Sequence, residues 1–205
     1  MKENQYLIIR DGRDNEVLNI FVWRGGELHD VRYHEIRNKW INKIKPRPNN
    51  PEQVCLFDAL NTPEITIVYA GGTWGCGKSF ILNNHALQEL ELGHINKIVY
   101  IPNNAYVANT IDIGALPGEK LDKVVGSIGP LLDIIGIDEV ERLEAEGQLE
   151  IVPMGFARGR SFEDSIIIVN EAIFGLPSAL TVLLKANESM LKVEPNRITI
   201  RYCLA

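Results

Sequence analysis

The segment that most constrains this chain is a glycine-rich octapeptide, GTWGCGKS at residues 72–79. It fits the pattern G-x-x-x-x-G-K-[ST] without a mismatch and follows an apolar, β-branched run at 65–70. A run with helical periodicity follows the loop at 79–92. A strand, a glycine loop and a helix in this order direct backbone N–H groups and the positive end of a helix dipole at one anion. The pattern therefore predicts a phosphate-binding loop in an α/β fold.

The residue types of the octapeptide suit phosphate and magnesium chemistry. Its glycines let successive N–H groups point inward, Lys78 can reach β and γ phosphates, and the Ser79 hydroxyl is a ligand for Mg²⁺. The side chains of Trp74 and Cys76 are interpreted as packing residues. The predicted cofactor-binding residues of the loop are Gly72, Thr73, Trp74, Gly75, Cys76, Gly77, Lys78 and Ser79.

A second motif follows the apolar run at 165–170, which is predicted to be a buried strand. Phosphoryl-transfer proteins with such a loop hold the metal with an acidic group at the end of a neighbouring strand. Asn170 stands where Asp is expected, and Glu171 follows it as a candidate general base. Asn170 is predicted to hold the metal through water, more weakly than Asp because it carries no charge. Whether the pair supports turnover is left open.

The chain divides at a proline-rich break, PRPNNP at 46–51. We predict a β-rich N-terminal element with a basic helix over 1–46 and a P-loop NTPase domain over 47–205. The N-terminal element has predicted strands at 6–10, 17–23 and 27–31 and a helix at 34–45. The second domain has predicted helices at 53–60, 79–92, 121–135, 138–146 and 177–187, and strands at 65–70, 95–101, 149–153, 165–170 and 197–203. Strands alternating with helices predict a mostly parallel sheet flanked by helices.

Charge and composition limit the partners. The chain carries 21 Lys and Arg against 27 Asp and Glu, so nucleic-acid binding through net charge alone is not expected. The acid excess falls in residues 111–205, which leaves one local basic run as a candidate RNA contact: Arg37, Lys39, Lys43 and Lys45. No apolar run is long enough for a membrane helix, and no signal peptide is evident, so a cytoplasmic location is expected.

Further motifs make the chain resemble the PhoH family of P-loop ATPases. They are an N-x-x-Q element at 50–53, LPGEKL at 116–121, FARGRSF at 156–162 and the strand that ends in Asn-Glu-Ala at 170–172. Residues 6–28 are similar to the small β element of proteins that fuse a PIN nuclease to PhoH, and a PIN nuclease is not expected in this chain. The resemblance implies ATP and Mg²⁺ as cofactors, an adenine contact for Gln53, and a hexameric ring. It also favours Arg158 and Arg160 as arginine fingers.

Two departures from the family's pattern leave the function open. Asn170 replaces the metal-binding Asp, and no T-G-D sensor follows the strand predicted at 197–203, so the domain is expected to be shortened at its C-terminus. The first hypothesis is an Mg²⁺-dependent ATPase that acts on RNA, with Lys78, Glu171, Arg158 and Arg160 as catalytic residues. The alternative is a nucleotide-binding scaffold with little or no hydrolysis. A small-molecule P-loop kinase ranks last, since residues 105–116 lack a basic lid.

Overall fold

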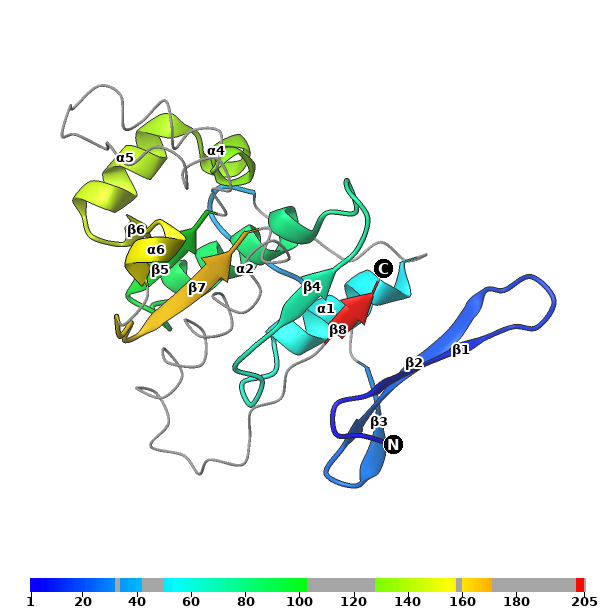
Figure 1. Cartoon of the computed structure of the whole chain (residues 1–205). Helices are drawn as coiled ribbons and strands as arrows, with labels where there is room; N and C mark the ends of the chain where they lie inside the picture. Colours follow the sequence, from blue (N-terminus) through cyan, green and yellow to red (C-terminus); the bar gives the residue numbers. More distant parts are fainter. Residues whose placement is uncertain (32–33, 42–49, 103–127, 158–159, 171–201, 205) are drawn as a thin grey trace. The chain divides into compact units, whose positions relative to one another are not determined.

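The structure is a computed structural model that describes residues 1–31, 34–41, 50–102, 128–157, 160–170 and 202–204 (Figure 1). The chain forms two compact units, and each is described by itself. The first comprises Met1–Arg37, Asn42–Lys78 and Ile198–Ala205, and the second comprises Asn38–Ile41 and Ser79–Arg197. These units divide the chain at other positions than the proline-rich break, so the boundary after residue 46 stays a prediction.

The first unit opens with an antiparallel sheet in the order β1-β2-β3. Its strands are β1 (Tyr6–Arg10), β2 (Val17–Arg24) and β3 (Glu27–Asp30), which confirms the three predicted strands to within a residue. Gly25 and Gly26 both have positive φ, 59° and 88°, as a two-residue hairpin turn of the primed type requires. The predicted hairpin element is therefore present.

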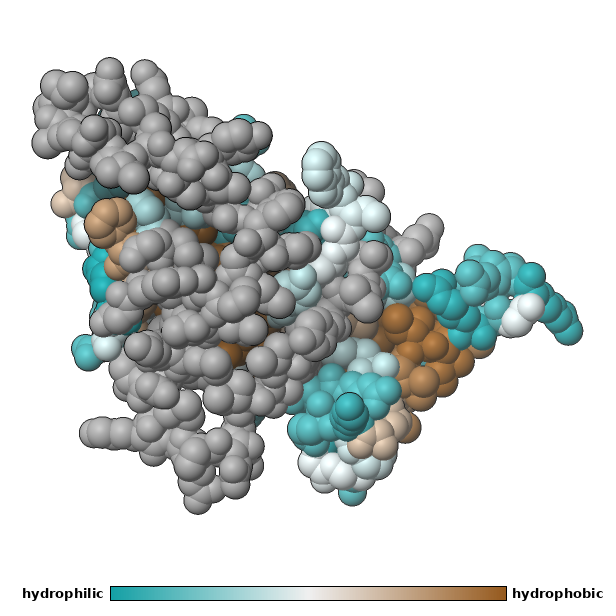
Figure 2. Space-filling view, in the orientation of Figure 1, coloured by the Kyte–Doolittle hydropathy of each residue, from teal (hydrophilic) through white to brown (hydrophobic). Residues whose placement is uncertain are grey.

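This sheet buries one face against helix α1 (Pro51–Leu60). Ile20 and Val22 of β2 pack with Val54 and Cys55 of the helix in one buried cluster. The other face carries the large apolar side chains of Leu7 and Ile9, which are 40% and 39% exposed. Figure 2 shows hydrophobic side chains gathered over β1 and β2. The sheet is thus apolar on both faces, but only one of them has a described packing partner.

The strand before the glycine loop is shorter than predicted. β4 (Tyr69–Gly71) pairs in parallel with β8 (Tyr202–Leu204) over three residues, while 65–68 form no strand. A strand needs a neighbour for its backbone hydrogen bonds, and the described partner β8 is only three residues long. Ile65 and Ile67 are nevertheless buried, as the apolar run predicts.

The second unit contains a parallel three-stranded sheet in the order β6-β5-β7. The central strand β5 (Lys97–Ile101) lies between β6 (Leu149–Ile151) and β7 (Ser165–Val169). Every residue of β5 from Ile98 to Ile101 is buried, because both faces of the sheet are covered. Ile98 and Tyr100 pack into one apolar cluster, and Val99 and Ile101 pack into another.

The described residues from Lys78 to Asn170 contain α2 (Lys78–Glu91), α4 (Gly129–Ile135), α5 (Ile137–Ala145) and the short α6 (Met154–Ala157). Leu87 of α2, Leu131 of α4 and Leu143 of α5 join the larger cluster on the sheet. α2 and α5 confirm predicted helices, and α4 confirms the end of the predicted helix at 121–135. α6 was not predicted. None of the helices in the described ranges is long and apolar enough to cross a membrane.

The helix predicted at 34–45 is wrong over its described part. Residues 34–41 contain a turn at 39–41 and no helix. Oδ1 of Asn38 accepts hydrogen bonds from the backbone N–H groups of Trp40 and Ile41, both at 3.1 Å. Such local bonds compete with helical ones, which explains the turn. Residues 42–45, the helix predicted at 177–187 and the start of the one at 121–135 lie outside the described residues.

The described strands and helices form an α/β fold of the P-loop NTPase type, with parallel sheets and a small antiparallel element before them. The glycine octapeptide runs from the end of β4 to the start of α2, the place that the sequence pattern predicts for it. The fold class is therefore confirmed.

Candidate phosphate-binding site

The glycine loop has the backbone that a phosphate-binding loop needs. Gly75 and Gly77 have φ of 79° and 88°, a region that residues with a side chain seldom adopt. Helix α2 begins at Lys78, directly after Gly77. The free N–H groups of its first turn and the positive end of its dipole therefore point back toward the glycine loop.

The side chain of Lys78 folds back onto this loop. Its Nζ donates to the carbonyl oxygens of Gly72 at 2.9 Å and Thr73 at 2.7 Å, and to Sγ of Cys76 at 3.3 Å. Three loop residues thus surround one ammonium group. A positive charge held beside a glycine loop is typical of sites that bind phosphate oxygens.

Two side chains of the loop behave differently from each other. Cys76 is half-buried and accepts the contact from Lys78. Trp74 is 100% exposed, so the interpretation of Trp74 as a packing residue is wrong. Its neighbours Thr73 and Gly75 explain the exposure of Trp74, because they offer no apolar surface against which the indole could pack.

Gln53 lies beside the loop from helix α1. Its Nε2 donates to the carbonyl oxygen of Cys76 at 3.2 Å. Asn50 caps the same helix, since its Oδ1 accepts from the N–H of Gln53 at 3.0 Å and Pro51 follows it. The N-x-x-Q element therefore has a structural function as a helix start. The sequence already carried this signal, because Asn-Pro-x-Gln is typical of a capped N-terminus.

Ser79 and Asn170 are the described candidates for the metal. Ser79 is the second residue of α2 and is half-buried. Asn170 directly follows β7, where its backbone N–H donates to the carbonyl oxygen of Ile101 at 3.1 Å. A hydroxyl and an amide oxygen fit a hard cation such as Mg²⁺, although neither brings a charge. Glu171 lies outside the described residues.

Arg160, a predicted arginine finger, forms a contact within the second unit. Its guanidinium lies 2.7 Å from Glu150 and 4.9 Å from the centre of the Phe162 ring. Lys97 also donates to Glu150, at 3.2 Å. Partial burial alone would raise the pKa of Glu150, but the hydrogen bonds from Arg160 and Lys97 outweigh it and hold the pKa below its ordinary value. Arg158 lies outside the described residues.

The candidate RNA contact includes cations that are already paired. Nζ of Lys39 lies 3.4 Å from Glu139 and 4.4 Å from the centre of the Trp40 ring. Arg37 pairs with Glu35 at 2.8 Å. Lys43 and Lys45 lie outside the described residues. The two described cations of the basic run therefore have acidic partners within the chain.

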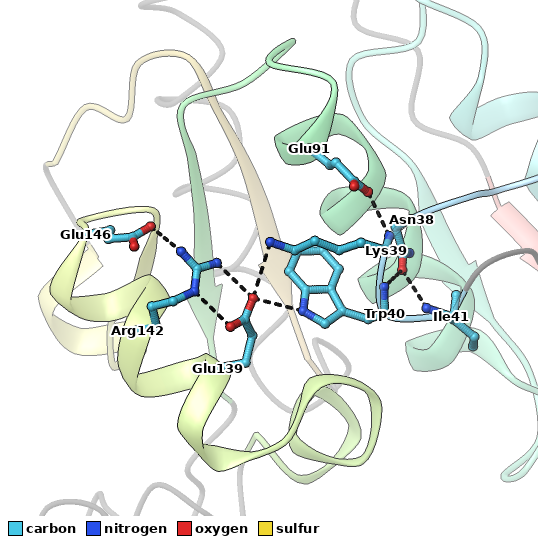
Figure 3. A network of polar contacts seen from close by, with 8 residues as sticks. All are labelled: Asn38, Lys39, Trp40, Ile41, Glu91, Glu139, Arg142 and Glu146. Atoms are coloured by element: carbon cyan, nitrogen blue, oxygen red, sulfur yellow. Dashed lines mark hydrogen bonds and ion pairs between the residues drawn. The ribbon is translucent and has the colours of Figure 1, made fainter.

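Glu139 is the centre of this network (Figure 3). Its carboxylate accepts from the indole N–H of Trp40 at 2.9 Å and from Arg142 at 2.8 Å. These contacts join the turn at 39–41 to helix α5. The bond from Arg142 is the main reason why the pKa of Glu139 is lowered to about 2.

No cluster of three His, Cys, Asp or Glu side chains that could hold a metal ion occurs among the residues that the structure describes. His85 is buried in α2, and this burial lowers its pKa. His34 lies 3.7 Å from Asp58, and His94 lies 2.9 Å from Glu89. In the described chain the histidines are thus separate, each with its own surroundings.

Comparison with known proteins gives one consistent result. A family profile described as "PhoH-like protein" matches residues 43–184. A PhoH-like protein of Bacillus subtilis is 34% identical over 122 residues, which are 58% of this chain and 38% of that protein. Protein PhoH2 of Thermobispora bispora is 31% identical over 62% of this chain and 30% of its own length. Protein PhoH of Escherichia coli is 28% identical over 60% and 35%. The matched region covers about a third of the length of these relatives.

Proposed function

Because this chain belongs to the PhoH-like protein family, we propose that it binds ATP through the loop at residues 72–79. The observation that carries this proposal is the contact of the Lys78 ammonium with three residues of its own loop. When triphosphate is bound, the ammonium exchanges neutral carbonyl partners for charged oxygens, and charge-assisted hydrogen bonds are the stronger ones. The backbone amides after Gly75 and Gly77 supply further donors without any charge of their own.

We further propose Mg²⁺-dependent hydrolysis, with Ser79 and Asn170 as the residues that would hold the metal. The metal supplies charge neutralisation at the transferred phosphate. Lys78 stabilises the β and γ phosphates, and Glu171 is the proposed general base for the attacking water. Arg158 or Arg160 is the proposed group for charge in the transition state. Arg160 has to leave Glu150 in order to serve in that way, which favours Arg158 of the two.

A specific observation favours the alternative of a nucleotide-binding scaffold. Asn170 stands directly after β7 and is neutral, so a cation there meets a hydroxyl and an amide instead of a carboxylate. Weaker metal binding slows hydrolysis more than it weakens ATP binding, because the charge of the metal matters most in the transition state. The chain would then respond to ATP without consuming it.

Action on RNA, assembly into a ring and a cytoplasmic location belong to the same proposal. Arg37 and Lys39 are paired with Glu35 and Glu139. An RNA contact at these residues therefore requires RNA phosphates to replace the two carboxylates as partners. Such an exchange predicts weak, strongly salt-dependent binding.

Phosphate release is the experiment that separates the two forms of the proposal. The rate is measured with ATP and Mg²⁺, with and without single-stranded RNA, on the unchanged chain and on Lys78→Ala. We expect release above the Lys78→Ala background, further stimulated by RNA. ATP binding with release equal to that background would reject the ATPase and support the scaffold. Equal ATP binding by both proteins would reject the site itself.

A further inference from the structure

The contact of Gln53 with the phosphate loop gives this residue a second possible role. Resemblance to the family assigns the glutamine to adenine, whereas its amide nitrogen here contacts the Cys76 carbonyl oxygen at 3.2 Å. The same nitrogen lies 3.7 Å from where a Cβ on Gly77 would be. The amide of Gln53 therefore lies against the Cys76–Gly77 peptide, and all of these atoms belong to the first unit.

The planarity of the peptide makes this contact relevant to phosphate. In a trans peptide the C=O group and the N–H of the next residue point in opposite directions. No cis peptide occurs in the described chain, so the N–H of Gly77 points away from the Gln53 side chain, whose amide donates to the Cys76 carbonyl oxygen. In a loop of this pattern that N–H is among the donors to phosphate. Gln53 thus fixes the orientation of a phosphate donor.

Helix capping alone does not explain a glutamine at this position. The cap uses only the backbone N–H of Gln53, and in a full capping box the side-chain oxygen of the third helical residue comes equally from Glu or Gln. Only Gln also has an N–H group to donate, and this is the group that contacts Cys76. The contact with the loop, and not the cap, therefore requires the side-chain amide of Gln53.

We infer that Gln53 is a positioning residue, which orients the Cys76–Gly77 peptide for the triphosphate of any nucleotide instead of selecting adenine. The inference rests on the proposed function, because the ligand is the one proposed for this loop. Its consequence is that loss of the Gln53 donor weakens binding of phosphate, whatever base the phosphate carries.

Gln53→Met removes the donor at similar length and without charge, and Gln53→Glu keeps the shape of the side chain but replaces the donor with an oxygen. Asn61→Ala is the matched control, since Nδ2 of Asn61 donates to the carbonyl oxygen of Phe57 at 2.7 Å at the other end of the same helix. Competition binding is measured for ATP, GTP and inorganic tripolyphosphate with Mg²⁺. The loss of one hydrogen bond predicts that Gln53→Met weakens all three by the same factor, about 3- to 10-fold. Asn61→Ala is expected to change none.

Two outcomes of this assay would overturn the inference. Weaker binding of ATP with unchanged tripolyphosphate would assign Gln53 to the base. Unchanged binding of all three ligands by Gln53→Met would remove any role for the contact. Gln53→Glu is expected to weaken binding more than Gln53→Met, because a carboxylate also repels phosphate and the Cys76 carbonyl oxygen.

A ligand-free measurement keeps this inference separate from the proposed function. Amide hydrogen exchange is followed at residues 72–78 in the absence of nucleotide. We expect faster exchange in Gln53→Met and Gln53→Glu and unchanged exchange in Asn61→Ala. Equal exchange in all proteins would reject the positioning role. Faster exchange, together with a failure of the unchanged chain to bind ATP, would reject the proposed function and leave the positioning of the loop supported.

Discussion

Replacing Asn38 with alanine is expected to destabilise the second unit by about 2–4 kcal/mol. Asn38 is only 5% exposed, and its Nδ2 donates to the backbone oxygen and to Oδ1 of Asn84, at 3.1 and 3.0 Å. Because Asn84 is fully buried, these two bonds are expected to contribute about 1–1.5 kcal/mol each. The bonds from the N–H groups of Trp40 and Ile41 add about a few tenths each, since water reaches these half-buried residues.

The assay is urea unfolding followed by circular dichroism, with the free energy of unfolding and the m-value fitted together. Asn96→Ala is the matched control, because Nδ2 of Asn96 is exposed and reaches Asp164 only at 3.5 Å. Asn96→Ala should lower the free energy of unfolding by less than about 0.5 kcal/mol. Asn38→Asp keeps the acceptor for Trp40 and Ile41 but directs a carboxylate at the oxygens of Asn84. It should therefore be at least as destabilising as Asn38→Ala at neutral pH.

If Asn38→Ala lowers the free energy of unfolding by less than about 0.5 kcal/mol, no more than the control does, the reasoning is contradicted. Such a result would mean that the turn at 39–41 is not anchored through Asn38. A loss in Asn38→Ala that Asn38→Asp fully recovers would contradict it in a different way, because the bonds to Asn84 would then contribute nothing.

Two further predictions follow from the metal position and from Glu139. Asn170→Asp should raise ATP turnover and lower the Mg²⁺ concentration that gives half the maximal rate, because a carboxylate binds the cation more tightly; an unchanged Mg²⁺ titration would remove Asn170 from the metal site. The folded-state pKa of Glu139, about 2, lies below its ordinary value of 4.5. Its unfolded form therefore binds the proton first, so its contribution to stability is present above about pH 4.5 and is lost as the pH falls toward 2. Urea unfolding from pH 6 to pH 2 should thus show a smaller loss in Glu139→Gln than in the unchanged chain, and equal losses would contradict this.

Local patterns predicted much of the fold. The two-glycine hairpin, the helix before the loop and the loop itself depend on neighbours along the sequence, and the structure has all three. Lys78 was predicted to act at the loop, and its ammonium lies there because the start of helix α2 directs it back. Such features follow from backbone preferences of glycine and from hydrophobic periodicity, which a sequence displays directly.

Features that depend on distant partners could not be predicted in the same way. Ile36 and Trp40 have helical spacing, but Ile36 is buried outside any helix, and Trp40 packs against the apolar cluster of the second unit from the turn at 39–41, whose N–H groups bond to Asn38. Gln53 contacts a carbonyl oxygen 23 residues further along the chain. Neither the Asn38 turn nor the Gln53 contact produces a periodic pattern in the sequence. The resemblance to a family therefore indicated the position of Gln53 but not its contact with the loop.

Calorimetric titration of ATP with Mg²⁺ into the full chain tests the central claim most directly, namely that residues 72–79 bind a nucleoside triphosphate. We expect a single site, whose affinity falls at least about tenfold in Lys78→Ala, because the ammonium makes a charge-assisted contact with phosphate. Lys97→Ala is the control, since Lys97 contacts Glu150 and no residue of the loop in the described contacts. It should bind ATP as the unchanged chain does. ATP binding of equal affinity in Lys78→Ala and the unchanged chain would contradict the claim.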